Sequence, residues 1–303
     1  MEKSQIYSCG FFFYDIDKSE IISYDNKGNI IKRREYGFTL KDDTQIEEEK
    51  EISVKEYSYA GDEMKTFGGE ICEYDVIGNP TTYRGKKATW TNGRFLNSYN
   101  NVAFSYDGLG RRIKKGNISY TYDSQGRLLK QSNGLEFLYD HSGVFAVKNG
   151  EKTYFYRKDA QSNITAIIDS EGSVVARYLY NAWGEVSVVD NTGKEITDKE
   201  NIANLNPYRY RSYYYDTETG LYYLKTRYYD PQVGRFMTID GIEYLDPETI
   251  NGLNLYAYCN NNPVMNVDPD GNKWYDVLAW IGVGLVVASV IILTAGMAGA
   301  VIS

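Results

Sequence analysis

Residues 106–143 read YDGLGRRIKKGNISYTYDSQGRLLKQSNGLEFLYDHSG, and Tyr-Asp followed by a Gly three residues after the Asp occurs in them three times. The copies begin at Tyr106, Tyr122 and Tyr139, which are 16 and 17 residues apart (122 − 106 and 139 − 122). Apolar and polar residues alternate around the copies, and period two is typical of strands. The Asp can accept hydrogen bonds from N–H groups of the turn that follows, and the Gly supplies a positive φ there. The stretch predicts a repeated unit of a strand, a tight turn and a returning strand.

The same unit extends outward from this stretch in both directions. Earlier copies begin at Tyr24 and Tyr74, and Tyr156 opens a degenerate form, YRKDAQSN, 17 residues (156 − 139) after the last full copy. Tyr180 opens a further variant, YNAWGEV. Such units cannot bury their apolar faces alone, so we expect them to stack on their neighbours into a long coiling sheet.

Composition narrows the classes of function. The chain has 303 residues, a formal net charge of −8 and a pI near 5.0, which argues against a nucleic-acid partner because phosphate binding needs a basic face. It has 30 Tyr against 11 Phe and 4 Trp, and Tyr suits half-buried strands. Cys9, Cys72 and Cys259 are few and far apart, which disfavours a disulfide framework or a zinc site. No phosphate-binding loop or His/Cys cluster is present, so we expect no cofactor and no metal.

The N-terminus has only a short apolar patch before Asp15 interrupts it. That patch is too short for a secretory signal peptide, so export would need a secretion apparatus or another polypeptide.

A denser motif follows the repeats. Residues 206–240 read NPYRYRSYYYDTETGLYYLKTRYYDPQVGRFMTID, and residues 254–272 read NLYAYCNNNPVMNVDPDGN. The Tyr-Asp array resembles the YD or RHS repeat family over roughly residues 20–272, and the run from Asn206 looks like the RHS repeat-associated core domain. The resemblance implies an all-β chain in which stacked YD hairpins (1–200) form part of a coiling β shell. It also implies a core domain (201–272) that closes the shell. The uncharged run within residues 273–303 predicts a hydrophobic C-terminal helix after that domain.

In that family the core domain can be an aspartic-type autoprotease, which cuts its own chain just after a DPxG motif. The motif arginine matches Arg227 in RYYDPQVGRF, and the two aspartates match Asp240 after GRFMTI and Asp268 in DPDGN, with the cut near Asn272. Two neighbouring carboxylates cannot both ionise easily, so one can act as acid while the other acts as base toward water. Arg227 could hold a carboxylate or the carbonyl. The alternative is that Asp before Pro or Gly simply marks a turn.

Two features depart from the family. Many processed members have Leu where this chain has Asn272, and an amide does not fill an apolar pocket as Leu does. The repeats are also fewer than a full shell uses. The chain therefore resembles the C-terminal part of a shell, a truncated relative, or a cassette that an upstream RHS polypeptide completes.

The C-terminal residues differ from the rest of the chain in charge and hydropathy. Residues 277–302, VLAWIGVGLVVASVIILTAGMAGAVI, contain no charge, and as a helix they would span about 39 Å, more than the roughly 30 Å of a hydrocarbon core. Trp274 and Trp280 are placed like interfacial anchors. The segment is a transmembrane candidate, or else a translocation element that the shell shields.

Three functional hypotheses follow. The first is a carrier that presents or encapsulates a C-terminal effector or translocation segment and cuts itself after DPDGN. The second is a tail-anchored surface protein whose Tyr-rich sheet binds cell-surface carbohydrate. The third is an inactive remnant of a larger toxin. The first two place the chain at a membrane, at the cell surface or in an exported assembly.

Overall fold

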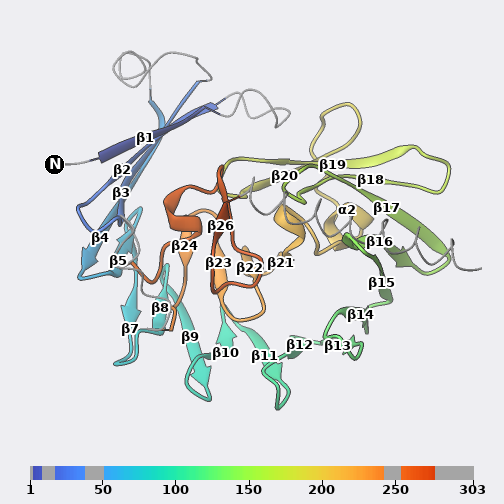
Figure 1. The fold of residues 1–303 in the computed structure, drawn as a ribbon, viewed down its shortest axis with the longest axis horizontal. Coiled ribbons are helices and arrows are strands. Elements are labelled where there is room, and N and C mark those ends of the chain that lie inside the picture. Colours follow the sequence, from blue (N-terminus) through green and yellow to red (C-terminus); the bar gives the residue numbers. More distant parts are fainter. Residues whose placement is uncertain (1–2, 9–17, 38–50, 242–253, 277–303) are drawn as a thin grey trace, which may run out of the picture.

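A computed structural model describes residues 3–8, 18–37, 51–241 and 254–276 (Figure 1). An antiparallel meander forms the wall of the molecule, with strands hydrogen-bonded to their neighbours in chain order. The predicted all-β architecture is confirmed. Residues 277–302, predicted as a hydrophobic helix, lie outside the described part of the chain. Within that part, no helix has the length and apolar character needed to cross a bilayer.

The wall consists of two sheets. The six-stranded sheet contains β1 (Lys3–Ser8), β2 (Lys18–Tyr24), β3 (Ile30–Gly37), β4 (Glu51–Ala60), β5 (Glu63–Phe67) and β6 (Glu70–Ile71). The fourteen-stranded sheet contains β7 (Glu73–Tyr74), β8 (Pro80–Tyr83), β9 (Lys86–Thr91), β10 (Phe95–Tyr99), β11 (Val102–Tyr106), β12 (Arg112–Lys115), β13 (Ile118–Tyr122), β14 (Leu128–Gln131), β15 (Leu135–Asp140), β16 (Gly143–Asn149), β17 (Lys152–Lys158), β18 (Ile164–Ile168), β19 (Val174–Tyr180) and β20 (Val186–Val189).

Four of the five Tyr-Asp repeats close in the same way on their own aspartate, whereas Asp140 of the fifth accepts from the N–H and hydroxyl of Ser142 in a shorter turn. Asp123 Oδ1 accepts hydrogen bonds from the N–H groups of Gln125 at 2.9 Å and Arg127 at 2.8 Å. Gly126 has φ +77° and donates its N–H to the Asp123 carbonyl at 3.1 Å. The predicted unit of strand, turn and returning strand is therefore confirmed. The same three bonds recur at Asp25, Asp75 and Asp107.

The same turn geometry continues beyond the clear Tyr-Asp copies. The degenerate unit that follows Tyr156 turns at Asp159, with Ser162 taking the positive φ, and the Tyr180 variant turns at Asn181. Two further turns, at Asp169 and Asp190, were not predicted because no Tyr precedes the Asp.

The wall curves around a central segment, which contains residues 202–241 and 254–276 (Figure 1). The proposed boundary at residue 200 falls between β20 and the first helix of this region, and it stays a prediction. The elements here are α2 (Ile202–Leu205), η1 (Tyr210–Ser212), β21 (Tyr214–Asp216), β22 (Leu221–Tyr223), β23 (Tyr228–Asp230), β24 (Arg235–Phe236), η3 (Cys259–Asn261), β25 (Asn266–Val267) and β26 (Tyr275–Asp276).

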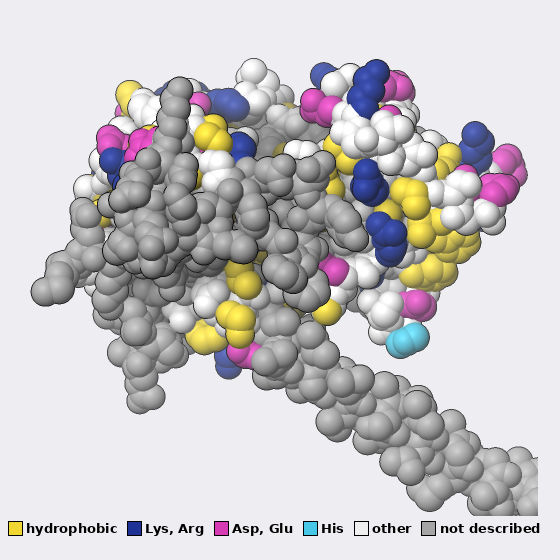
Figure 2. All heavy atoms as spheres, turned by 90° about the horizontal axis from the view of Figure 1, so that it is seen from above, with side chains coloured by type: hydrophobic (Ala, Val, Ile, Leu, Met, Phe, Trp, Pro, Cys, Tyr) yellow, Lys and Arg dark blue, Asp and Glu magenta, His cyan; other side chains and the backbone are white. Residues whose placement is uncertain are grey.

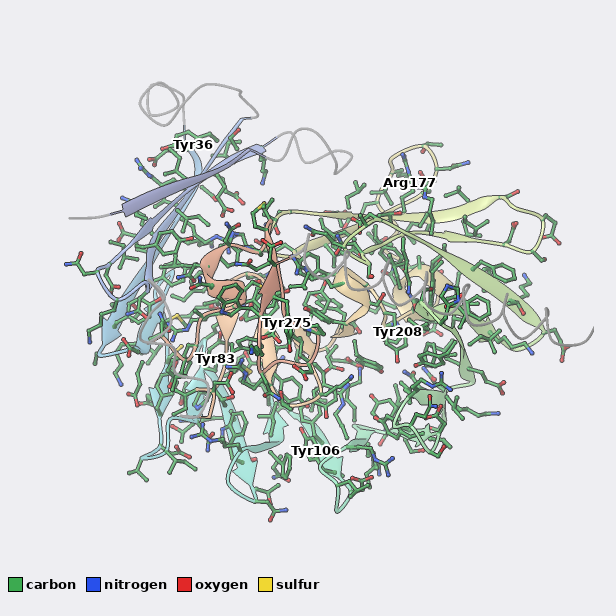
Figure 3. The ribbon with its side chains drawn as sticks, in the orientation of Figure 1. Tyr36, Tyr83, Tyr106, Arg177, Tyr208 and Tyr275 are labelled. Atoms are coloured by element: carbon green, nitrogen blue, oxygen red, sulfur yellow. The ribbon has the colours of Figure 1, made fainter. Side chains whose placement is uncertain are left out.

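Tyrosine rings fill the space between wall and centre, and their hydroxyl groups bond across it. Such a ring buries apolar surface while its hydroxyl keeps a polar partner, which explains why Tyr rather than Phe is abundant. Tyr106 and Tyr208, labelled in Figure 3, take part in two of these pairs. The bonds include Tyr57 to the Val233 carbonyl (3.0 Å), Tyr106 with Tyr228 (2.8 Å), Tyr120 with Tyr214 (3.1 Å), Tyr139 with Tyr208 (2.9 Å) and Tyr156 to Asn206 (2.7 Å).

This packing bears on the carbohydrate-binding hypothesis. Among the tyrosines of residues 18–37, 51–241 and 254–276, only Tyr275 is exposed, with 40% of its surface accessible. Stacking on a sugar needs an accessible ring face. The wall tyrosines pack in or against the hydrophobic core, so they do not offer such faces.

Ion pairs also tie the wall to the centre. Arg112 of β12 donates to both carboxylate oxygens of Asp216 in β21, at 2.5 and 3.1 Å, and both side chains are buried. The Arg112 guanidinium also lies 4.3 Å from the ring centroid of Tyr223. A bidentate pair combined with stacking fixes the orientation of the strands as well as their distance.

The surface is mixed in charge where it can be seen. In Figure 2, basic and acidic side chains are interspersed over the coloured part of one face, and His141 stands exposed at a repeat turn. That visible area contains no large field of one sign.

Candidate functional site

The structure brings the three predicted site residues together. Arg227 lies just before β23 and Asp268 just after β25. Asp240 lies beyond β24, where its N–H donates to the Leu255 carbonyl at 3.1 Å. All three are buried, with 7%, 7% and 2% of their surfaces exposed. The fold therefore unites residues that are far apart in sequence, and their chemical role stays a prediction.

One guanidinium nitrogen serves both carboxylates. Arg227 Nη2 lies 2.7 Å from Asp240 Oδ2 and 3.7 Å from Asp268 Oδ2. The guanidinium carbon lies 3.6 Å from the ring centroid of Phe236, which fixes the plane of the fork. The arrangement places two acidic groups on one side of a single buried cation.

The other nitrogens of Arg227 hold backbone. Its Nη1 donates to the Leu255 carbonyl at 3.0 Å, and its Nε donates to the Gly271 carbonyl. Gly271 has φ +85°, and a Cβ at this position would lie 2.8 Å from Thr226 Oγ1 and 3.0 Å from the Leu224 carbonyl oxygen. Only glycine fits so close to residues 224–226, which directly precede Arg227. This close packing explains why the last position of the DPxG motif is a glycine.

Asp268 has two distinct oxygens. Its Oδ1 accepts hydrogen bonds from the N–H groups of Gly271 at 2.9 Å and Asn272 at 3.1 Å, while Oδ2 faces Arg227. Asp268 therefore does close a turn, through Oδ1, as the alternative interpretation expected. Its Oδ2 takes no part in that turn and faces Arg227. Asp240 likewise accepts from the Gly241 N–H at 2.8 Å with Oδ1 and pairs with Arg227 through Oδ2.

Burial raises the pKa of Asp268 above its usual value, although Arg227 and the two turn N–H groups favour the charged form. Asp240 is paired with the same arginine at the shorter distance. One buried cation therefore faces two buried carboxyl groups, of which Asp240 is the closer.

Three neighbours were not predicted. Tyr213 donates its hydroxyl proton to the Asp268 carbonyl at 2.5 Å, and Thr226 Oγ1 donates to the Asp270 carbonyl at 2.8 Å. Phe236, beneath the guanidinium, is part of the GRF run already noted in the sequence. Thr226 is adjacent to Arg227 in the sequence, so its place near the site could have been predicted. Nothing in the sequence connects Tyr213 with Asp268.

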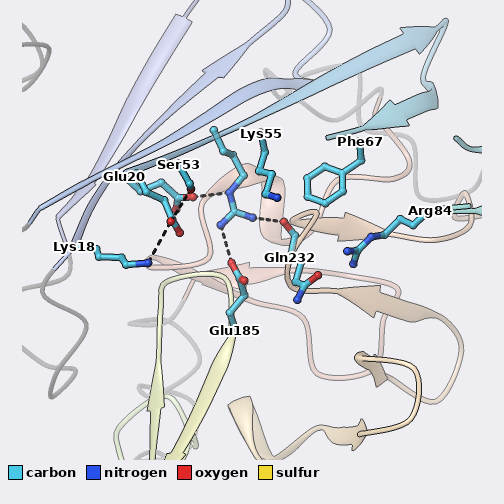
Figure 4. Close-up of a pocket in the computed structure, with 10 residues that line it drawn as sticks. Lys18, Glu20, Ser53, Lys55, Phe67, Arg84, Glu185 and Gln232 are labelled. Carbon is cyan, nitrogen blue, oxygen red and sulfur yellow. Dashed lines mark hydrogen bonds and ion pairs between the residues drawn. The ribbon is translucent and has the colours of Figure 1, made fainter. Parts of the chain in front are cut away.

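A separate polar pocket of about 310 Å³ lies where the six-stranded sheet meets the β19–β20 turn (Figure 4). Arg33, which lines the pocket, pairs with Glu20 at 2.5 Å and Glu185 at 3.1 Å. Lys18, also in the lining, pairs with Glu35 at 3.2 Å. Most of its charges therefore neutralise one another. Within the described residues, no group of three or more His, Cys, Asp and Glu side chains is arranged to hold a metal ion.

Comparisons with known proteins agree with this architecture. Residues 129–264 match the Teneurin YD-shell family model. The tRNA3(Ser)-specific nuclease WapA of Bacillus spizizenii is 34% identical over 262 residues, which cover 84% of this chain and 9% of that protein. The tRNA nuclease WapA of Bacillus subtilis is 48% identical over 121 residues, covering 40% of this chain and 5% of that protein.

Solved structures show the same fold. The Tc holotoxin pore of Photorhabdus luminescens aligns with a TM-score of 0.60 and 18% identity, covering 84% of this chain and 13% of that one. The chain thus spans less than a tenth of the WapA proteins that it matches. The family-model match and the shared fold together support an RHS/YD shell protein whose relatives are WapA nucleases and whose structural neighbours are Tc toxin components.

Proposed function

We propose that this chain is a carrier segment of a toxin-associated RHS shell, which presents the polypeptide beyond DPDGN and releases it by cutting its own chain near Asn272. The observation that carries the proposal is the buried cluster in which Arg227 contacts Asp240, Asp268 and the Gly271 carbonyl together. A turn alone needs neither the second carboxylate nor a guanidinium on the carbonyl oxygen.

The chemistry assigns each group a role. Asp240, paired with Arg227 at 2.7 Å, stays ionised and acts as the base that takes a proton from water. Asp268, whose pKa is raised by burial, supplies a proton to the leaving amine. Arg227 stabilises the negative charge that develops on the carbonyl oxygen under attack.

The carrier role places the cluster at a junction. The wall and central segment end there, and the uncharged residues 277–302 follow directly in sequence. Those residues would be the presented segment, which could insert into a membrane after release. A longer RHS polypeptide would supply the remaining wall strands, since WapA relatives are more than ten times the length of the region that matches.

The full chain with tags at both ends tests self-cleavage. Wild type should give an N-terminal product that lacks the C-terminal tag on blots and by intact mass. Asp240→Asn and Asp268→Asn should each slow its formation by roughly 100-fold or more, because each removes one half of the acid–base pair.

Two controls keep the test interpretable. Asn181 closes a repeat turn by accepting two backbone N–H bonds, so Asn at position 268 can keep the turn that Asp268 closes. Asp169→Asn makes the same change in an ordinary repeat turn and should leave cleavage unaltered. A wild-type chain that keeps its full-length mass would refute self-cleavage.

A further inference from the structure

The outer face of the wall carries a row of apolar side chains that crosses five strands. Residues directly opposite one another on antiparallel strands lie on the same face of a sheet, and the register from β15 to β19 aligns one such set. The alternate residues of these strands, such as Phe137, Val147 and Ile167, pack in the hydrophobic core, so this set lies on the outer face. The members of this apolar row are Leu138, Ala146, Phe155, Ile168 and Val174.

The apolar row is accessible, and it differs from the rest of the wall. Phe155 is 40% exposed, and the ring of Phe145 stacks on it with the two centroids 6.4 Å apart. Figure 2 shows hydrophobic side chains gathered beside His141, at the turn that joins β15 to β16. In earlier units, opposed residues on the outer face are polar, as in the pairs Ser58 with Thr66, Thr89 with Ser98, and Thr121 with Lys130.

Basic side chains border the apolar row on both sides. On one side, Lys148 follows the row by two residues along β16. On the other side, Arg157 follows it by two residues along β17, and Arg177 of β19 lies in the same line. None of the three forms an ion pair within the described residues, and Glu136, opposite Lys148, pairs with Lys130 at 2.5 Å. The face therefore combines apolar surface with net positive charge.

The dimensions of this face match those of a short helix. Neighbouring strands lie about 4.8 Å apart, so five strands give a row about 19 Å long, which a helix of about 13 residues would cover. The cations lie about 7 Å from the row along the strands, which is close to the half-width of a helix with its side chains.

We propose that the apolar row is the docking surface for an amphipathic helix of a partner polypeptide, with apolar residues on one face and Asp or Glu along both edges of that face. Such a helix would bury the row and pair its carboxylates with Lys148, Arg157 and Arg177. Docking of this kind goes beyond the carrier role and does not require self-cleavage.

Two other occupants fit the face less well. A bilayer would bury a broad apolar surface rather than one row of side chains, and an anionic bilayer would repel a chain whose net charge is −8. A second copy placed on the same face would bring cations against cations.

Two matched peptides test the docking. A fluorescent synthetic helix of about 14 residues carries leucines on one face and glutamates along both edges of it, and the second helix has lysines in place of the glutamates. Each is titrated with the full chain, and fluorescence anisotropy measures binding. The glutamate peptide should bind roughly 10-fold or more tightly than the lysine peptide at low salt, and the difference should shrink as salt is added.

Substitutions separate the apolar contribution from the charged one. Phe155→Ser should weaken binding of the glutamate peptide roughly 10-fold, because it removes the exposed ring of the row. Leu109→Ser, which removes an exposed apolar side chain at the β11–β12 turn, should leave binding unchanged. Arg157→Glu keeps the apolar row and should remove most of the preference for the glutamate peptide. Circular dichroism checks that each variant keeps the wild-type β-sheet signal, and if Phe155→Ser loses it, Arg157→Glu carries the test.

The outcomes that would overturn the proposal are distinct. Equal binding of the two peptides would do so, as would binding of the glutamate peptide that a folded Phe155→Ser chain retains in full. If the glutamate peptide fails to bind while phosphatidylglycerol vesicles bind in a Phe155-dependent way, the face is a membrane contact instead. If the peptide fails to bind and sedimentation shows a dimer that Phe155→Ser abolishes, the face is a contact between copies.

Discussion

Two buried arginines show how much a single guanidinium organises in this fold. Arg227 engages two carboxylates, two backbone carbonyls and an aromatic face, and Arg112 combines a bidentate pair with aromatic stacking. The planar fork makes this possible, since a lysine would supply a point charge and no second directed donor.

Arg112→Met should destabilise the protein by roughly 3–5 kcal/mol, because it leaves buried Asp216 without its bidentate partner. Lys115 Nζ lies 3.2 Å from the same carboxylate and would still pair with it. We therefore expect the loss of stability to lie toward the lower end of this range. Urea unfolding at neutral pH measures the change. Arg127→Met is the matched control, since Arg127 pairs with Asp123 at an exposed turn, and it should change stability little. Equal effects of the two substitutions would contradict a special role for the buried pair.

The motif resemblance selects three residues from the sequence as a candidate site, and their role stays a prediction, whereas their contacts could not be predicted. The motif resemblance selected Arg227, Asp240 and Asp268, and the fold places them together. The position of Arg227 on the Gly271 carbonyl depends on the strand ends and on the ring of Phe236, which no local pattern specifies.

At the scale of the element, the repeat turn depends on one acceptor and one backbone conformation. The Asp carboxylate satisfies two N–H groups that a tight turn would otherwise leave without partners, and the Gly adopts a φ that side chains disfavour. Turns at Asp169 and Asp190 keep this geometry without a preceding Tyr, so the Asp and Gly carry the turn signal. A search for Tyr-Asp alone therefore misses units that the same physics builds.

Gly110→Ala should destabilise the wall by about 1–2 kcal/mol, because φ there is +78° and an added Cβ would lie 3.0 Å from Phe95 Cζ. Gly108, in the same turn, has no positive φ and open space around its Cα, so Gly108→Ala should be neutral or stabilise by about 0.5 kcal/mol. Chemical denaturation of both variants checks the difference. A Gly108→Ala change as costly as Gly110→Ala would contradict the conformational explanation.

At the scale of the whole molecule, the wall encloses its centre through tyrosines whose phenol groups are kept neutral. Burial raises the pKa of Tyr139, Tyr178 and Tyr210 to about 12, against the usual value of about 10. The unfolded chain would release these protons at lower pH than the folded chain.

The free energy of unfolding should therefore be maintained up to pH about 10 and fall as pH rises from there to about 12. Tyrosinate absorbance and circular dichroism, followed together through an alkaline titration, measure this. Most of the tyrosine ionisation should coincide with loss of structure. Tyrosines that ionise fully while the β-sheet signal is unchanged would contradict the buried-phenol explanation.

The stacking of the units was predictable from their apolar faces, but the curvature around a central segment was not. Contacts such as Tyr106 with Tyr228 and Arg112 with Asp216 join residues more than 100 positions apart. Periodicity reports which face of a strand is buried and not which distant segment covers it.

The self-contained repeat turn has a consequence for how such a wall can change over evolutionary time. The common turn is closed by bonds among five consecutive residues, such as Asp123 to Arg127. Tyr122 and Tyr139 each donate to a backbone carbonyl of the unit just before, at Arg112 and Leu128. The turn of a unit therefore depends only on that unit and its predecessor, although its buried side chains also contact the central segment. In-frame duplication or loss of one unit would leave every other turn chemically intact, so the contacts with the central segment, and not the turns, limit how the length of the wall can change.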